Sequence, residues 1–381
     1  MIYYLTYYLM TANTFIASLH NFMIYSYIMK TKKSRSFYII LAAILSVLFI
    51  LFAVKPLSTE YQFIPEWKID VTNPNLKQAD SNQKIHHYKL GQTLGYFTED
   101  GKITNFVSFP FKASVSEYYY TTYNTNNKSS QIFNPDGTEK SRINISGFPM
   151  IDNENIFVFL PGGSAFVMCD SDGNRMWEFS GAVPITAFDS SKSGVACGFA
   201  DGTVRVLDLT GRVIQNFIPG GSDYPVILGV AISNAGDMIA TVSGQNKQRF
   251  VLAKKNGTQT KIIFHEFLDI SDPSQKLVKF SDNDNYVYYV SGDKLGIVDT
   301  QTKKHIHINI SGQAISLREN NNSVFLLTKD QNKYTVYTVE KFATLTGSFS
   351  FEANNTFIHA YDDALYVGKD YTISKLHIKK E

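Results

Sequence analysis

The sequence predicts an all-β chain, a β-propeller of about seven four-stranded blades preceded by an N-terminal transmembrane helix, with eight blades as the alternative count. Two observations lead to this prediction. Paired β-like runs joined by a tight turn recur at intervals of about 40 residues, the length of a propeller blade. One long apolar run precedes these repeats, and no stretch with helical periodicity follows it.

The first segment, residues 1–36, is expected to be cytoplasmic, with part of it able to enter the membrane. Residues 1–28 contain no Lys, Arg, Asp or Glu, so a first spanning helix is one interpretation. In the other, the natural chain starts at Met29, and a short basic region followed by an apolar run then forms a typical signal-anchor. Both interpretations leave the C-terminal region outside the cytoplasm.

Residues 37–54, FYIILAAILSVLFILFAV, are predicted to form the transmembrane helix. These 18 residues carry no charge, and as a helix they span about 27 Å, close to a bilayer core of about 30 Å. Lys55 alone follows the run, whereas four cations precede it: Lys30, Lys32, Lys33 and Arg35. The positive-inside rule therefore predicts a single-pass membrane protein with an extracytoplasmic propeller. A cleavable signal peptide and a buried core helix are the alternatives.

Residues 55–84 are interpreted as a linker between the membrane and the domain. The stretch is polar, shows no sustained hydrophobic period and contains Pro56, Pro65 and Pro74. The propeller is therefore expected to occupy residues 85–381.

The repeating unit is clearest in FADGTVRVLDLTGRVIQNF, residues 199–217, which predicts a strand, a tight turn and a second strand. Related hairpins recur, and five of them share a turn glycine: Gly101, Gly137, Gly173, Gly211 and Gly257. Successive turn glycines lie 36, 36, 38 and 46 residues apart. Lys303 takes the equivalent place in a sixth copy, and roughly Ala343 in a seventh.

Two more strand-like runs separate successive hairpins, as in PVILGVAISNAGDMIATVSG before the Gly257 turn. Each unit thus contains four antiparallel strands, which is the content of a propeller blade. Residues 355–378 predict two or three strands without a closing partner, and the hairpin at 91–109 lacks clear strands before it. We therefore expect these two segments to share one blade that closes the ring.

An aliphatic strand is followed by DSDGNRMW, residues 170–177, in which Asp170, Gly173 and Trp177 form a spaced pattern. Asp208 and Gly211 repeat this pattern without the Trp. On these residues the chain resembles, over roughly 90–381, the bacterial WD40-like and quinoprotein-like (PQQ-like) propellers, although Trp-Asp dipeptides are absent. The anchor followed by a propeller resembles bacterial membrane-anchored WD40-like proteins without an established activity. The resemblance implies the propeller fold and the bacterial inner membrane, but no particular reaction.

Composition and cysteine content argue against several classes of function. The formal net charge is +2 over 381 residues, so nucleic acid is not an expected partner. The two cysteines, Cys169 and Cys197, cannot form a disulfide scaffold and are expected to be buried free thiols. Quinoprotein dehydrogenases generally use a vicinal cysteine pair, whereas these two lie 28 residues apart, so no quinone cofactor is expected.

The acidic stretch that begins at Asp170 resembles the start of a calcium loop. However, Arg175 and Gly181 stand where an EF-hand loop requires Gly and Glu, so an ordinary Asp-Gly turn is expected.

The histidine pairs give little support for a metal site. His305 and His307 lie two apart on a predicted strand and share one face, but zinc would require a third and a fourth ligand. His86 and His87 are adjacent and would face opposite sides of a strand. Since no Cys or carboxylate cluster stands nearby in the sequence, we expect no metal and no cofactor. No nucleophile elbow, phosphate-binding loop or dinucleotide fingerprint is present, so no catalytic residue is assigned.

The most unusual part of the chain is PGGSDYP, residues 219–225, a loop that enters the first strand of a blade. A polar, basic loop, QNKQR, follows in the same blade at 245–249. Because propeller loops commonly carry ligands, we expect ten residues to form a partner-binding surface: Gly220, Gly221, Ser222, Asp223, Tyr224, Gln245, Asn246, Lys247, Gln248 and Arg249.

The predicted function follows from this layout. We expect a membrane-tethered extracytoplasmic β-propeller that acts as a protein-binding or envelope-assembly scaffold, with protein partners at the membrane or in the cell envelope. The alternative is an extracytoplasmic propeller hydrolase or lyase acting on glycans or lactones, with carboxylates converging on the central channel.

Overall fold

The computed structural model describes residues 32–53, 61–72, 74–77, 83–124, 126, 128–221, 224–257, 259–320, 323–340 and 345–380. The chain divides into two compact units, Met1–Ser58 and Thr59–Glu381. The first unit contains one described helix, and the second contains all the described strands.

Helix α2 (Lys32–Ala53) includes all of the predicted transmembrane segment, residues 37–54, except its last residue. That residue, Val54, and residues 1–28 lie outside the described residues. Large apolar side chains are exposed along it: Phe37, Ile39, Ile40, Ile44, Leu45, Val47, Leu48 and Phe49. Within the described residues, no helix combines the length and the hydropathy needed to cross a membrane.

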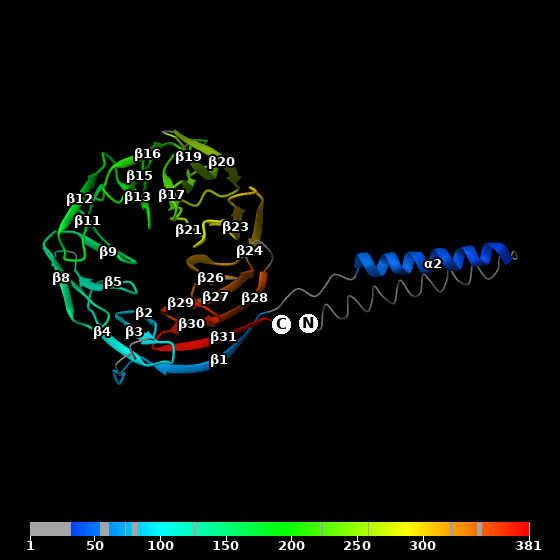
Figure 1. Cartoon of the computed structure of the whole chain (residues 1–381), viewed down its shortest axis with the longest axis horizontal. Coiled ribbons are helices and arrows are strands. Elements are labelled where there is room, and N and C mark those ends of the chain that lie inside the picture. Colours follow the sequence, from blue (N-terminus) through cyan, green and yellow to red (C-terminus); the bar gives the residue numbers. More distant parts are fainter. Residues whose placement is uncertain are drawn as a thin grey trace. The chain divides into compact units, whose positions relative to one another are not determined.

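The second unit is a β-propeller, in which eight antiparallel sheets stand as blades around a ring (Figure 1). Blade 1 has three described strands and blades 2 to 4 have four each. Their strands are, in chain order, β2 (Ile85–Leu90), β3 (Thr93–Thr98), β4 (Ile103–Ser108); β5 (Lys112–Val115), β6 (Tyr120–Tyr123), β7 (Ser130–Phe133), β8 (Glu139–Ile143); β9 (Phe148–Asp152), β10 (Asn155–Phe159), β11 (Ala165–Cys169), β12 (Arg175–Ser180); β13 (Ile185–Ser191), β14 (Gly194–Phe199), β15 (Val204–Asp208) and β16 (Val213–Phe217).

Blades 5 to 7 continue the same order, and blade 8 combines the last three strands of the chain with the first. Their strands are β17 (Ile227–Ile232), β18 (Met238–Ser243), β19 (Gln248–Asn256), β20 (Gln259–Leu268); β21 (Val278–Phe280), β22 (Tyr286–Ser291), β23 (Lys294–Asp299), β24 (His305–Asn309); β25 (Gln313–Glu319), β26 (Ser323–Asp330), β27 (Lys333–Glu340), β28 (Leu345–Glu352); β29 (Thr356–Tyr361), β30 (Ala364–Lys369), β31 (Thr372–Lys380) and β1 (Tyr61–Asp70).

The ring closes through strand β1, which corrects three sequence-based expectations. The count is eight blades, not about seven. The stretch at 55–84 contains β1 and is therefore not simply a linker. The 91–109 hairpin forms blade 1 together with β2, and the C-terminal strands pair with β1 in blade 8, so the two segments do not share a blade. Strand β1 was not predicted because Pro65 lies within it, and proline argues against a strand in a sequence. In the structure Pro65 stands at a register shift, where the strand pairing tolerates the missing N–H.

The predicted hairpins with described turns are confirmed, and each turn joins the last two strands of its blade. Gly211 has φ +82°, and Lys303, predicted to replace the glycine in the sixth copy, has φ +62°. Both values lie in the left-handed region that a tight turn of this kind needs. The seventh position, Ala343, lies outside the described residues.

Each blade interface has its own hydrophobic core. Side chains alternate along every strand, so successive residues face the preceding and the following blade. Eight clusters of buried residues result among the described residues, one for each pair of neighbouring blades. The cluster between blades 8 and 1, which includes Tyr88, Phe97 and Tyr366, seals the ring at its closing point.

Antiparallel order gives the propeller two distinct faces. Loops from first to second and from third to fourth strands emerge on one side, which we call the hairpin-turn face. Loops from second to third strands, and those that pass to the next blade, emerge on the other side, which we call the crossover face. The first strands of the blades surround the central channel (Figure 1).

Candidate functional site

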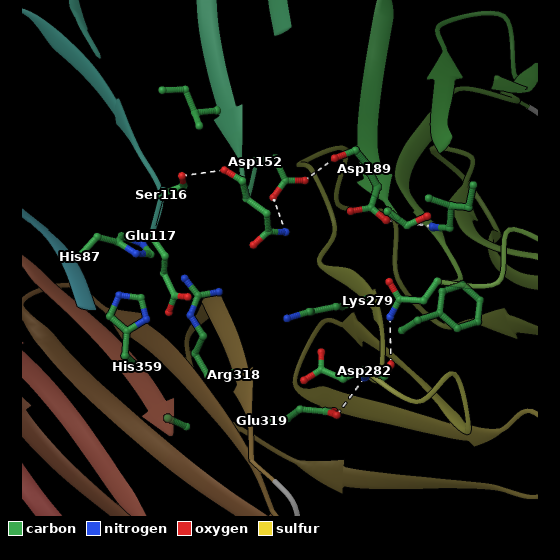
Figure 2. A pocket seen from close by; sticks show the side chains of 18 of the residues that line it. His87, Ser116, Glu117, Asp152, Asp189, Lys279, Asp282, Arg318, Glu319 and His359 are labelled. Carbon is green, nitrogen blue, oxygen red and sulfur yellow. Dashed lines mark hydrogen bonds between the residues drawn. The ribbon is translucent and has the colours of Figure 1, made fainter. Parts of the chain in front are cut away.

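A polar pocket of about 430 Å³ lies at the central channel, on the hairpin-turn face. Its position follows from the topology, because the first strands end there: Asp152 ends β9, Ser191 ends β13 and Glu319 ends β25. All eight blades contribute to the lining, from His87 in blade 1 to His359 in blade 8. Figure 2 shows these side chains converging on one space.

Two carboxylates from neighbouring blades form one part of the wall. The Ser190 hydroxyl donates to Asp152 Oδ2 at 2.5 Å, and the Ile232 N–H donates to Asp189 Oδ2 at 2.9 Å. Burial, and to a lesser degree the Asp152 charge, raises the pKa of Asp189 to about 7, although the Ile232 hydrogen bond opposes the shift. At neutral pH both the protonated and the ionised form of the Asp189 carboxyl are therefore populated.

Two cations form another part of the wall. Lys279, on β21, and Arg318, on β25, are half-buried, and Figure 2 shows the Lys279 side chain reaching into the pocket. Burial lowers the pKa of each, with a further contribution to Lys279 from Arg318. Within the described part of the chain, neither cation forms an ion pair with a carboxylate. Both positive charges are consequently available to a ligand.

Two neutral histidines complete the lining. The rings of His87 and His359 meet edge to face, with their centroids 4.4 Å apart. Burial lowers the pKa of His87 to about 3 and that of His359 well below its usual value, and the Arg318 charge adds to both effects. Each imidazole therefore offers hydrogen bonds without charge at neutral pH.

The predicted partner-binding loops lie on the crossover face, opposite this pocket. Arg249, at the start of β19, donates from Nη1 to the carbonyl oxygens of Pro219 and Gly220, at 3.0 and 3.2 Å. The structure thus brings the two predicted loops together. Ser222 and Asp223 lie outside the described residues.

Not every predicted loop residue faces a partner. The side chain of Gln248 is fully buried, and its Nε2 donates to the Asp272 carbonyl oxygen at 2.5 Å. Gln248 therefore has a structural role and is removed from the predicted surface. Lys247 adopts a left-handed conformation with φ +55°, as expected for a residue in a tight loop.

Exposed apolar side chains lie beside Arg249 and next to the loop that it binds. Ile218, Tyr224 and Phe267 are 59%, 57% and 57% exposed, and the guanidinium carbon of Arg249 lies 5.6 Å from the Phe267 ring centroid. We call these four residues the Arg249 patch. The sequence prediction included Tyr224 and Arg249 but missed Ile218 and Phe267. Phe267 belongs to β20, and only the blade geometry places it beside the loops.

Comparison with known proteins agrees with this architecture. The model of a beta-propeller protein family matches residues 29–381. The chain belongs to this family. A relative from Treponema pallidum (strain Nichols), described as an uncharacterized protein, is 27% identical over 361 residues, which cover 92% of this chain and 96% of the relative.

Two solved structures share the fold of this β-propeller protein. BamB from Moraxella catarrhalis has a TM-score of 0.59 and 10% sequence identity, covering 83% of this chain and 100% of BamB. KlAtg21, in complex with the coiled-coil of AgAtg16, has a TM-score of 0.53 and 14% identity, covering 70% of this chain and 98% of the matched chain. At such identities the likeness concerns the fold alone. The narrower resemblance to WD40-like and PQQ-like repeats stays a prediction.

The other sequence-predicted positions are dispersed through the propeller. Cys169 and Cys197 are buried free thiols on β11 and β14, as expected. The Asp170 carboxylate accepts hydrogen bonds from the backbone N–H groups of Asp172 and Asn174 at 3.0 and 2.8 Å. Such bonds are typical of an ordinary Asp-Gly turn, as expected. His86 is buried against the Tyr366 ring, 4.8 Å between centroids, whereas its neighbour His87 lines the pocket.

His305 and His307 do share one face of β24, as predicted. The structure adds what the sequence did not indicate, a carboxylate beside them: Glu266 on β20 of the preceding blade. It lies 41 residues from His307, and no local spacing motif links them.

Proposed function

We propose that this β-propeller protein is a membrane-tethered scaffold that holds a protein partner on its crossover face, outside the cytoplasm. The observation that carries the proposal is the Arg249 patch: the guanidinium lies beside the exposed Phe267 ring and is hydrogen-bonded to the loop whose neighbours Ile218 and Tyr224 are also exposed. Protein interfaces are enriched in aromatic residues and arginine, and a few such residues contribute most of the binding energy.

The patch is organised before any partner binds. Arg249 Nη1 donates to two carbonyl oxygens, so the guanidinium has a defined place beside Phe267. A side chain held in this way loses less conformational entropy on binding than a free arginine. The apolar neighbours then gain by leaving water when a partner covers them.

The fold is suited to this role. In its structure the similar propeller KlAtg21 is complexed with the coiled-coil of AgAtg16, so a ring of this kind is able to present a surface to another protein. This likeness supports the class of function, a protein-binding propeller, and identifies no particular partner.

The tether is proposed to be residues 37–54. Their lack of charge, the basic residues before them and the exposed apolar side chains of α2 support insertion in a bilayer, where such side chains are stable. The proposed location is the bacterial inner membrane, with the propeller on the periplasmic side. There the Arg249 patch would meet other membrane or envelope proteins.

The test is crosslinking in intact cells, purification of the full chain from membranes and mass spectrometry. We expect a reproducible protein partner whose recovery falls at least about tenfold in a double variant, Tyr224→Ala with Phe267→Ala, the effect of losing about 1.4 kcal/mol. Tyr118→Ala is the matched control, since Tyr118 is 43% exposed in the turn between β5 and β6, on the hairpin-turn face. Equal recovery from the double variant and the control would contradict the proposal.

A second candidate function is hydrolysis or elimination on a glycan or lactone in the channel pocket. The specific observation is the pair Asp152 and Asp189, because a carboxyl with a pKa raised to about 7 is able to act as a general acid or base beside a second carboxyl group. A screen of glycans and lactones tests this function. Turnover that Asp189→Asn abolishes would support it, and turnover insensitive to that variant would exclude this pair.

A further inference from the structure

We propose that Glu266, His305 and His307 bind a divalent transition-metal ion, Zn²⁺, at the outer edge of the propeller between blades 5 and 6. The inference is independent of the scaffold function and of the channel pocket. It rests on three side chains from two strands, each of which offers one ligand atom.

The distances suit a metal of this size. His307 Nε2 lies 3.0 Å from Glu266 Oε1, and His305 Nε2 lies 3.9 Å from Glu266 Oε2. The three ligand atoms all lie within 4.8 Å of one another. Zinc bound tetrahedrally at about 2.0–2.1 Å separates its ligand atoms by about 3.3 Å, a value between the two measured separations. Only small side-chain rotations are therefore needed to enclose an ion.

The strand geometry explains why these side chains converge. His305 and His307 are alternate residues of β24, so they extend from the same face, and their ring centroids are 5.5 Å apart. Glu266 extends from β20, the fourth strand of the preceding blade. Because β20 and β24 are equivalent strands of adjacent blades, the carboxylate meets the two imidazoles across the blade interface.

A buried tyrosine positions the carboxylate. The Tyr289 hydroxyl donates to Glu266 Oε1 and also lies 3.2 Å from His307 Nε2. The Tyr289 ring is fully buried and stacks on Phe250, with centroids 3.9 Å apart and an interplanar angle of 15°. Hydrogen bonds of this kind orient metal ligands and strengthen metal binding.

The ligand set selects the metal. Two imidazole nitrogens and one carboxylate oxygen suit zinc, nickel or copper, whereas calcium and magnesium prefer oxygen ligands alone. The histidine side chains are 45% and 35% exposed and that of Glu266 is 17% exposed, so water can reach the ion. Three protein ligands and one water complete a four-coordinate zinc site.

The test is titration of the metal-free full chain, purified in detergent, with Zn²⁺ by calorimetry and with Co²⁺ by visible absorption. We expect one ion per chain and the intense absorption of four-coordinate Co²⁺. Glu266→Gln and His307→Ala should each weaken Zn²⁺ binding at least about tenfold, and Tyr289→Phe should weaken it by about 10–100-fold while all three ligands remain.

The matched control is His265→Ala. His265 adjoins Glu266 on β20 and therefore extends from the other face of the strand, and it is also exposed. This variant should bind Zn²⁺ like the unaltered chain, and circular dichroism should show every variant folded. The proposal is overturned if the unaltered chain binds no Zn²⁺, or if His265→Ala weakens binding as much as His307→Ala does.

Discussion

At the residue scale, two tryptophans join neighbouring blades in the same way. Trp177 on β12 donates its Nε1–H to the Leu209 carbonyl oxygen at 2.9 Å, and Trp67 on β1 donates its Nε1–H to the Glu99 carbonyl oxygen at 3.0 Å. In each case the ring also packs against the turn glycine of the next blade. These are the two tryptophans of the chain. Their equivalence shows that β1, although first in sequence, acts as the fourth strand of its blade.

This contact gives a stability prediction at Gly211. A Cβ there would lie 2.7 Å from Trp177 ring atoms, and φ is +82°. We expect Gly211→Ala to destabilise the propeller by about 2–4 kcal/mol, as the sum of backbone strain and overpacking. Gly162→Ala is the control, because Gly162 has φ +99° but no heavy atom within 4 Å of the added Cβ. Equal urea midpoints for the two variants would show that the tryptophan contact adds nothing.

The channel pocket gives a prediction about pH. Because the pKa of Asp189 is raised from 3.8 to about 7, the folded state keeps its proton over a range in which the unfolded state loses it. Stability therefore falls as the pH rises through this range, by at most about 4 kcal/mol at about 1.4 kcal/mol for each pH unit. Asp189→Asn, which retains an acceptor for Ile232, should be near neutral at about pH 4 and stabilising at about pH 8. Urea unfolding at both pH values measures this, and the same difference at each would refute it.

At the scale of elements, β1 is the strand on which the ring depends. It pairs along its length with β31. The ring centroid of Phe63 lies 5.1 Å from that of Phe349 in blade 7, and Trp67 is hydrogen-bonded to blade 1. Without β1, the edge of β31 would be unpaired and the apolar faces of two neighbouring blades would be exposed.

Two truncated chains test this dependence. A chain that begins at Thr59 retains the whole second unit and should melt cooperatively. A chain that begins at Thr72 loses β1 and with it several hundred Å² of apolar burial, a cost on the order of 10 kcal/mol. This shorter chain should aggregate or be degraded. Cooperative melting of both chains at the same temperature would mean that the ring closes without β1.

The strands themselves were largely predictable, because turns and alternating apolar residues are local signals. The hairpins around Gly101, Gly137 and Gly211 needed only a few neighbouring residues to be recognised. Strand β1 was missed because its proline and its polar outer residues obscure the alternation. A strand at an outer edge has only one side paired, so its sequence is less constrained than that of an inner strand.

At the scale of the whole propeller, the two faces differ in chemistry. The hairpin-turn face has the charged channel pocket, and the crossover face has the Arg249 patch. A ligand in the channel and a protein on the opposite face would therefore not compete for the same surface. The proposed tether also predicts the membrane topology, with the whole propeller on one side of the membrane.

Topology can be measured with a single added cysteine. Asn126→Cys lies in an exposed loop between β6 and β7, whereas the native Cys169 and Cys197 are buried and should not react. We expect a membrane-impermeant maleimide to label this variant in intact spheroplasts, with the unaltered chain as the background control. Labelling that requires lysis would reverse the proposed orientation.

The sequence by itself determined the propeller fold, the hairpin turns and the segment proposed as a tether, because each depends on residues close together in the chain. Tertiary structure decided the rest. The pairing of β1 with β31, the approach of Asp189 to Asp152 and the meeting of Glu266 with His307 all join residues tens to hundreds of positions apart. Such contacts arise from the stacking of blades around a ring, and no local pattern of side chains records which partners that stacking brings together.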